Sequence, residues 1–222
     1  MTEAHRNFYG RRHGKALKPN QRQWLDEDLP RLAVPDGPVD PARLFDGRPV
    51  WLEIGFGSGE HLAHQAAAHP DVGLIGAEPF VNGVATCLGK LRAAGVSNVR
   101  IWKGDVRDLL DRIAPASLAK AFLLYPDPWP KARHHRRRFV TPDHLLPLAR
   151  ALAPGAEVRL ATDIPDYVRQ ALDELPRAGF ARTSDGAADI HTPWPDWTRT
   201  RYEAKALREG RTPHYLTFTR TG

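Results

Sequence analysis

The chain has 222 residues, of which 41% are hydrophobic and 26% charged, a balance typical of globular proteins and unlike that of disordered chains. Its formal net charge of +6 favours a polyanionic partner. The single cysteine, Cys87, cannot form an internal disulfide, and we expect it to pack as a small hydrophobe. Neither a signal peptide nor an apolar run of about 18 residues is present, so we expect a soluble, cytoplasmic protein with no membrane partner.

The positive charge is concentrated in two segments. Residues 1–24 carry six cations and one acid, and residues 131–138 carry five cations and no acid, whereas the rest of the chain is net acidic. The cations are Arg6, Arg11, Arg12, Lys15, Lys18 and Arg22 in the first segment, and Lys131, Arg133, Arg136, Arg137 and Arg138 in the second. One such run is often only a solvated face, but two runs in a chain that is otherwise acidic indicate a nucleic-acid surface.

The N-terminal part predicts an arm followed by a connector. After the basic residues, the pattern of residues 16–32 predicts a short helix that closes at Pro30. Prolines interrupt residues 36–49, which therefore cannot form one continuous element. We accordingly divide the chain into an arm and connector over residues 1–48 and one domain over residues 49–222.

From residue 50 onward, apolar strand patterns alternate with helical patterns. The strands are predicted over residues 50–56, 72–78, 98–105, 120–126 and 157–163, and the helices over residues 60–69, 81–95, 106–113, 141–155 and 164–175. Residues 214–220 alternate as a further strand at one edge of the sheet. Continuous apolar strands separated by helices predict a doubly wound, mostly parallel α/β domain.

In such a fold the ligand lies beyond the carboxyl ends of the strands. Glycines or acids stand at each of these ends, namely Gly55, Gly57 and Gly59, then Glu78, Asp105, Asp127 and Asp163. Because the ends of parallel strands meet at one rim, we expect these residues to surround a common site.

The glycine turn predicts the class of cofactor. The segment EIGFGSGEHL lacks the third glycine of a dinucleotide fingerprint and has Glu60 in its place. An acid there disfavours a pyrophosphate but tolerates the sulfonium cation of S-adenosylmethionine, which brings no phosphate. Glu78 is placed to accept hydrogen bonds from ribose hydroxyls, and Asp105 to accept one from the adenine amine or to cap the next helix.

The segment YPDPWPKARHHRRRFV places an acid between two prolines, directly before the second basic run. The prolines stiffen the loop and hold Asp127 near the expected methyl group. His134 and His135 lie among cations, which favours a phosphate or loop role over acid–base catalysis. The group of Trp194, Trp197 and Tyr202 suits either stacking on a base or core packing. We find no nucleophile arrangement and no metal-ligand spacing.

Together the segments EIGFGSGEHL, GAEPF, GDVRDLL, YPDPWPKARHHRRRFV, LATD and TRYE resemble the bacterial tRNA (guanine-N7)-methyltransferase family, and the likeness covers essentially the whole chain. The resemblance implies a seven-stranded Rossmann-like class I methyltransferase that modifies guanine 46 in the tRNA variable loop. It implies donor contacts at Glu53, Glu78, Asp105 and Asp127. It implies substrate contacts at Lys131, Asp163, Thr200, Arg201, Tyr202 and Glu203, and RNA contacts at Arg133, His134, His135, Arg136, Arg137 and Arg138. His135, Arg201 and Tyr202 depart from the residues commoner in the family.

The chemistry of this acceptor agrees with the residues present. Guanine N7 has a lone pair and no proton, so its methylation needs orientation and nearby negative charge rather than a general base. Asp127 is the candidate catalytic residue, and either Asp163 or Glu203 is placed to bind the guanine edge. Two alternatives stay open: methylation of an exocyclic amine on another RNA or DNA base, and a binding module whose donor site has decayed.

Overall fold

The computed structural model describes residues 9–183 and 190–222, and Arg6 of the basic arm lies outside them. The strands are β1 (Val50–Ile54), β2 (Gly73–Ala77), β3 (Val99–Trp102), β4 (Leu118–Leu124), β5 (Leu152–Thr162), β6 (Phe180–Arg182) and β7 (His214–Arg220). The helices are α1 (Pro19–Glu27), α2 (Leu29–Leu32), α3 (Pro41–Leu44), α4 (Glu60–Ala68), α5 (Val81–Ala94), α6 (Val106–Leu110), α7 (Pro142–Ala151), α8 (Pro165–Arg177) and α9 (Arg201–Arg208). A 3₁₀ helix, η1, spans Ala132–Arg137.

The strands form one sheet in the order β3-β2-β1-β4-β5-β7-β6. The pairs among β1 to β5 are parallel, and β7 runs antiparallel between β5 and β6. The strand order reverses between β1 and β4, which is where a doubly wound sheet opens a crevice. The predicted fold class is confirmed.

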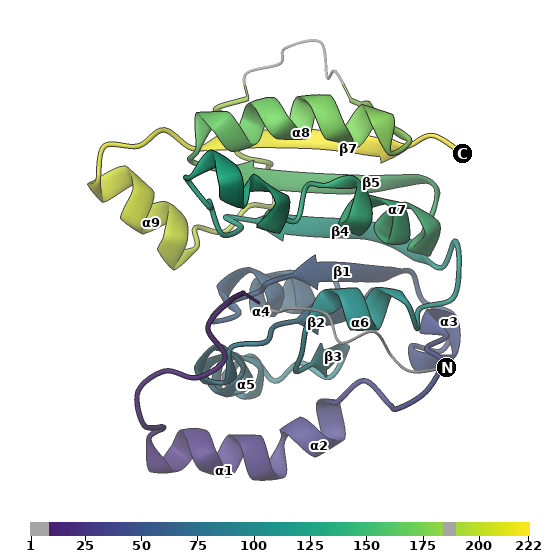
Figure 1. Ribbon diagram of the computed structural model, residues 1–222. Helices are drawn as coiled ribbons and strands as arrows, with labels where there is room; N and C mark the ends of the chain where they lie inside the picture. The colour runs from purple at the N-terminus through teal and green to yellow at the C-terminus, as the bar shows by residue number, and fades with distance from the viewer. Residues whose placement is uncertain (1–8, 184–189) are drawn as a thin grey trace.

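Each face of the sheet is covered by helices, as the apolar strands require. On β2, Leu74 packs with Leu62 of α4 and Leu88 of α5, whereas the next residue, Ile75, packs with Leu109 of α6. Successive strand residues point to opposite faces, so a strand covered on both sides is apolar throughout. Figure 1 shows α6, α7 and α8 on the near face, with α4 and α5 behind.

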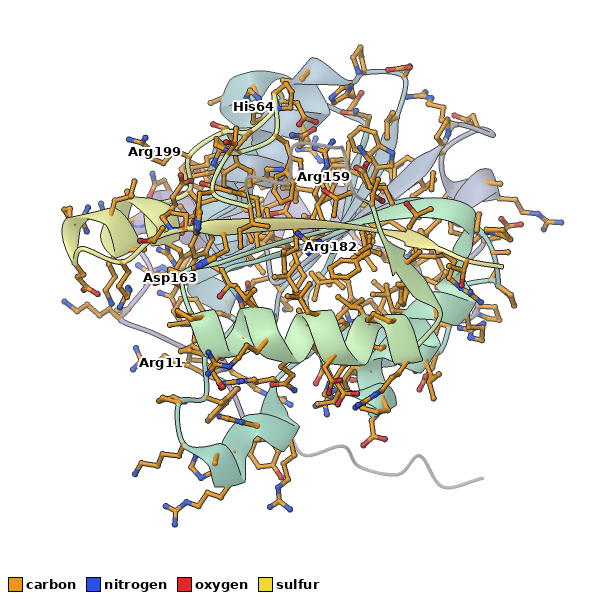
Figure 2. The ribbon with its side chains drawn as sticks, turned by 90° about the horizontal axis from the view of Figure 1, so that it is seen from above. Arg11, His64, Arg159, Asp163, Arg182 and Arg199 are labelled. Atoms are coloured by element: carbon orange, nitrogen blue, oxygen red, sulfur yellow. The ribbon has the colours of Figure 1, made fainter. Side chains whose placement is uncertain are left out.

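Aromatic side chains cover the part of the second face formed by β4, β5 and β7. Phe122 and Tyr215 are buried there beneath Trp194 and Trp197, which come from the segment before α9. Arg159 lies in this layer, its guanidinium 5.1 Å from the Trp194 ring centroid, and Figure 2 labels it near the middle of the sheet. Of the two interpretations of the tryptophans, the structure therefore supports packing.

The N-terminal segment packs on the domain that follows it. Trp24 of α1 lies against Gly89 of α5, where a Cβ would come within 2.5 Å of the indole ring. Ala33 and Val39 form parallel bridges with Ile101 and Ile113. The division at residue 48 stays a prediction, and it separates segments that share these contacts.

The structure differs from the predicted elements in several places. β5 begins at Leu152, where we predicted helix, because Leu152 pairs with Leu118 before the register shifts near Lys120. β6 and α9 were not assigned to segments from the sequence. Within the described residues, no helix is both long enough and apolar enough to cross a membrane.

Candidate active site

A cleft of about 640 Å³ opens at the rim where β1 to β4 end. Most of the predicted strand-end residues line it, as do parts of the basic arm and of α9. From the predicted set these lining residues are Gly55, Gly57, Glu78, Asp105, Asp127, Arg136, Arg137, Arg201 and Tyr202. The ends of β1 to β4 therefore meet at one common cavity.

The three glycines of the turn after β1 have positive φ but different surroundings. Gly55 has φ +71° and lines the cleft, and a Cβ placed on it would meet no atom within 4 Å. Gly59, with φ +75°, lies against Cys87, whose Sγ would be 2.3 Å from such a Cβ. Gly55 thus leaves room for a ligand, whereas Gly59 allows α4 and α5 to pack closely.

The predicted repulsion by Glu60 is weaker than the sequence suggested. Its carboxylate pairs with Nζ of Lys90 at 2.9 Å, and Glu60 does not line the cleft. The ion pair offsets the negative charge at the start of α4. The acids that do line the cleft, Glu78, Asp105 and Asp127, therefore indicate the class of cofactor better than Glu60 does.

Glu78 presents a buried carboxylate at the end of β2. Its Oε2 accepts a hydrogen bond from the backbone N–H of Gly57 at 2.7 Å, and its Oε1 accepts one from Phe80 at 2.9 Å. Burial raises the pKa of Glu78, and the neighbouring charge of Asp127 adds to this effect. The two backbone bonds orient the carboxylate and leave further lone pairs for a ligand.

Asp105 caps α6 and is already strongly engaged. Its Oδ1 accepts from the backbone N–H of Arg107 at 3.0 Å, and its Oδ2 accepts from Nε of the same residue at 2.8 Å and also from Nη2. Although burial acts to raise it, these bonds and the charge of Arg107 hold the pKa of Asp105 below its usual value. Asp105 therefore caps α6 as predicted, and hydrogen bonds from Arg107 use most of the acceptor positions of its carboxylate.

Asp127 lies in the proline-bracketed loop between β4 and η1. Two residues of this loop, Tyr125 and Trp129, have φ values of +49° and +40°, a left-handed conformation that side chains rarely adopt. Among the described residues Asp127 has no hydrogen-bond or ion-pair partner, and partial desolvation in the cleft raises its pKa although the residue remains exposed to solvent. An unpaired, partly desolvated carboxylate in a strained loop is suited to meet a positive charge.

The second basic run divides into three environments. Arg136 and Arg137 line the cleft, and the Arg137 guanidinium lies 4.2 Å from the ring centroid of Tyr9 and 5.1 Å from that of Trp129. Lys131 and Arg133 are exposed outside the cleft, as His134 and His135 are in part. Arg138 is only 1% exposed.

The burial of Arg138 gives it an internal role. Its Nη1 lies 2.8 Å from a carboxylate oxygen of Asp166 and 2.8 Å from the amide oxygen of Gln170. Its Nε donates to the carbonyl of Pro128 at 2.8 Å. Arg138 thus fastens the Asp127 loop to α8, and its guanidinium is not available to RNA in this structure.

Three further predicted contacts also face inward. Oε2 of Glu53 lies 2.8 Å from Nδ1 of His61, and both side chains are buried away from the cleft. Glu203 accepts from Trp197 Nε1 at 2.7 Å and from the Tyr215 hydroxyl at 2.8 Å. Thr200 caps α9 by accepting from the backbone N–H of Glu203.

α9 carries its exposed face to the cleft. The ring of Tyr202 lies over Gly57, where a Cβ would come within 2.9 Å of it, and Arg201 donates to the Tyr202 hydroxyl at 2.8 Å. Asp163, after β5, pairs with Nε of Arg211 at 2.5 Å. Figure 2 shows Asp163 and Arg11 at the same rim of the molecule.

The cleft also contains residues that were not among the predicted site residues. Tyr9 and Arg11 reach it because Val81 N–H donates to the Arg12 carbonyl and Asn82 bonds the backbone of Gly14 and Lys15. The other lining side chains include Arg107, Phe139, Asp143 and His144. The basic arm gave a signal for Arg11, but nothing in the sequence pattern pointed to His144. The described residues contain no group of three or more His, Cys, Asp and Glu side chains that could hold a metal ion.

A family model described as "Putative methyltransferase" matches residues 47–216. Among solved structures, the 16S rRNA (adenine(1408)-N(1))-methyltransferase from Catenulisporales acidiphilia superposes with a TM-score of 0.57 at 18% identity, covering 86% of this chain and 98% of that one. The [4+2]-cyclase SpnF superposes with a TM-score of 0.53 at 15% identity, covering 90% of this chain and 80% of that one, so likeness at this level shows the fold alone. The fold and the acid-lined cleft define the class I methyltransferase architecture.

Curated relatives narrow this class. A tRNA (guanine-N(7)-)-methyltransferase of Ruegeria pomeroyi is 65% identical, covering 97% of this chain and 94% of the relative. The protein of the same name from Roseobacter denitrificans is 62% identical over 99% and 98%, and that from Rhodospirillum rubrum 48% identical over 96% and 87%. The chain belongs to the bacterial tRNA (guanine-N7)-methyltransferase family.

Proposed function

We propose that the protein transfers the methyl group of S-adenosylmethionine to N7 of a guanine in tRNA, and that this guanine is position 46 of the variable loop. The observation that carries the proposal is the carboxylate of Asp127, which has no partner in the part of the chain that the structure describes and lines one cleft with the acids Glu78 and Asp105 and with Arg136 and Arg137. Acids suit a cationic donor, and cations suit a nucleic acid. Identity to the relatives over nearly the full chain supports the choice of tRNA and of guanine N7.

The residues present fit the donor. The space beside Gly55 is of the kind that a nucleoside needs for close approach to the backbone, and the cleft volume lies in the range of small-molecule sites. The free lone pairs of Glu78 suit ribose hydroxyls. Glu53 would act indirectly, since it lies beneath the glycine turn and is held by His61.

The donor supplies an electrophilic methyl group on a sulfonium sulfur. Guanine N7 brings its own lone pair and loses no proton, so no residue of the chain needs to act as a base. The role of the site is to align N7 with the methyl carbon and to stabilise positive charge as it develops on the purine. Asp127 would do so, since no cation of residues 9–183 or 190–222 pairs with its carboxylate.

The exposed cations near the cleft would bind the tRNA. Lys131, Arg133, His134, His135, Arg136 and Arg137 would contact phosphates, together with Arg11, which lines the same cleft. Arg201 and Tyr202 would border the guanine, and Asp163 would bind its edge from the rim. We do not extend the contacts to Arg138, Thr200 and Glu203, whose polar groups are engaged inside the protein. Because its substrate is tRNA, the protein would work in the cytoplasm.

The direct test is methyl transfer from tritiated S-adenosylmethionine to unmodified bacterial tRNA, followed by nucleoside analysis. We expect label in 7-methylguanosine and none when adenine replaces guanine at position 46. Label in an N-methylated exocyclic amine would instead support the alternative acceptor. Binding of tRNA without binding of the donor would indicate a decayed enzyme.

A further inference from the structure

His144 lies at the end of the cleft that also contains Asp105. It stands in the first turn of α7 and lines the cleft together with Phe139 and Asp143. Its ring stacks on that of Phe139, with centroids 5.5 Å apart and an interplanar angle of 22°. The imidazole is therefore fixed in orientation, as a specificity residue must be.

The surroundings of Nδ1 fix the tautomer of His144. Nδ1 lies 3.1 Å from the carbonyl oxygen of Arg138, 3.2 Å from that of Phe139 and 3.1 Å from the hydroxyl oxygen of Thr141, which can also accept a hydrogen bond. Carbonyl oxygens only accept, so Nδ1 carries the proton and donates it. In the neutral ring Nε2 is then a hydrogen-bond acceptor, and no described residue bonds to it.

The charges around His144 favour this neutral ring. Burial lowers the pKa of His144, and the positive charge of Arg107 on α6 lowers it further. The two carbonyls and the negative charge of Asp105 act in the opposite direction without reversing the shift. Asp143 is the neighbouring acid on α7 itself. The pKa of His144 is below its usual value, so Nε2 accepts at neutral pH.

Asp105 alone has too few free acceptor positions for the exocyclic amine of the donor's adenine. The backbone N–H, Nε and Nη2 of Arg107 already donate to its two oxygens. A carboxylate has about four acceptor positions, so little of its capacity is left. An exocyclic amine brings two hydrogens and needs a further acceptor on the same side of the cleft.

We propose that His144 is a specificity-determining residue for the methyl donor, whose Nε2 accepts a hydrogen bond from the exocyclic amine of adenine. This inference rests on the proposed donor site. A purine with a carbonyl at the same position presents a lone pair to the lone pair of Nε2, so it is rejected while His144 is neutral. Protonation makes Nε2 a donor and removes that discrimination.

The test is calorimetric binding, without tRNA, of S-adenosylhomocysteine and of its deaminated analogue S-inosylhomocysteine. At about pH 7.5 we expect the adenine compound to bind about tenfold more tightly, and we expect this ratio to shrink at a pH below the usual histidine pKa of about 6.5, as the pH falls through the lowered pKa of His144. The pKa of Asp105 is also lowered, so Asp105 stays charged, and both ligands share the ribose contacts of Glu78.

Three variants separate the role of His144 from general effects. His144→Phe should lose most of the ratio and its pH dependence, whereas His144→Gln, which keeps an acceptor oxygen, should retain part of the ratio without the pH dependence. His64→Phe, an exposed histidine on α4 labelled in Figure 2, should behave as the wild type. If a His144 variant does not fold, the wild-type pH series still decides.

The inference is overturned if the wild-type ratio does not change with pH, or if His144→Phe keeps both the ratio and its pH dependence. If neither compound binds to the wild type, the donor site itself is wrong and the proposed function fails with it. Binding of both compounds with equal affinity at each pH would reject the role of His144 and leave the donor site standing.

Discussion

At the scale of single residues, two glycines of the turn after β1 have different roles. Gly55 leaves space for a ligand, whereas Gly59 allows two helices to pack closely. A Cβ on Gly59 would overlap Sγ and Cβ of Cys87 at 2.3 and 2.7 Å, whereas one on Gly55 would meet nothing within 4 Å. Both positions have positive φ, so alanine costs about 1 kcal/mol of backbone strain at either. Only Gly59→Ala adds an overlap between buried helices.

We therefore expect opposite outcomes from the two alanine variants. Gly59→Ala should lower the free energy of unfolding by about 2–4 kcal/mol through overpacking and strain together. Gly55→Ala should lose only about 1 kcal/mol but should bind S-adenosylhomocysteine much more weakly. Denaturant unfolding and calorimetry measure the two effects. Equal stability losses would show that Gly55 also has a packing role.

Asp127 is the residue whose charge we expect to matter most. Asp127→Asn keeps the shape of the side chain and removes the negative charge, so kcat should fall by about 10²-fold or more, with tRNA affinity little changed. Because partial desolvation raises the pKa of Asp127, wild-type turnover should fall on acidification at a pH above the usual value of about 3.9. The carboxylate is functional above its pKa and is lost as the pH falls through it.

Asp173→Asn is the matched control. Asp173 lies on α8 and pairs with Arg177 at the surface, away from the cleft. It should retain wild-type kcat and the wild-type pH profile. Full activity of Asp127→Asn would remove Asp127 from the mechanism.

At the scale of elements, α9 is held in place by a buried carboxylate. Glu203 is 4% exposed and joins the helix to Trp197 and to Tyr215 of β7, while Arg201 and Tyr202 of the same helix face the cleft. In the segment TRYE, Arg201 and Tyr202 thus line the cleft. Thr200 caps α9, and Glu203 bonds the helix to the rest of the domain. The spacing of the segment places Glu203 two residues from Arg201, on a different side of the helix.

Glu203→Gln should therefore act first on stability. The amide oxygen can replace only one of the two acceptors, and the NH₂ group would force the Tyr215 hydroxyl to accept instead of donate, so we expect a loss of about 1–3 kcal/mol in the free energy of unfolding. Glu209→Gln, at the exposed end of α9, should change it by less than about 0.5 kcal/mol. If Glu203→Gln were fully stable but inactive, Glu203 would contact the guanine itself.

At the scale of the whole molecule, the sequence predicted the positions of strand ends better than the directions of side chains. Gly55, Glu78, Asp105 and Asp127 were found because the ends of parallel strands share one rim by geometry. Whether a charged side chain reaches that rim or turns inward depends on its tertiary partners. Arg138 turns inward to Asp166, and no local pattern distinguishes it from Arg137.

The same limit explains the other differences. Glu53 faces His61 because α4 packs over that part of β1, a contact between elements that periodicity does not encode. His144 reaches the cleft because α7 starts beside α6, which also depends on packing. By contrast, the sequence alone predicted which segments carry the positive charge of the site. Residues of both basic segments line the same cleft.

The two basic segments lead to a prediction about salt. Arg136 and Arg137 both line the cleft on one side, and Arg11 reaches it from the arm. If Arg136 and Arg137 each contact a phosphate, Arg136→Ala combined with Arg137→Ala should weaken tRNA binding. The slope of log Kd against log salt should become shallower by about 2, about 1 for each lost contact.

The control removes equal charge from the opposite rim of the sheet. Arg43 on α3 and Arg177 at the end of α8 are exposed and lie outside the cleft, where Figure 1 places both helix ends far from α9. Arg43→Ala combined with Arg177→Ala also lowers the net charge by two, so it should leave the slope nearly unchanged. If both double variants shift the slope equally, net charge rather than local contact drives binding. A shift confined to the cleft pair would assign tRNA to the face that carries Asp127.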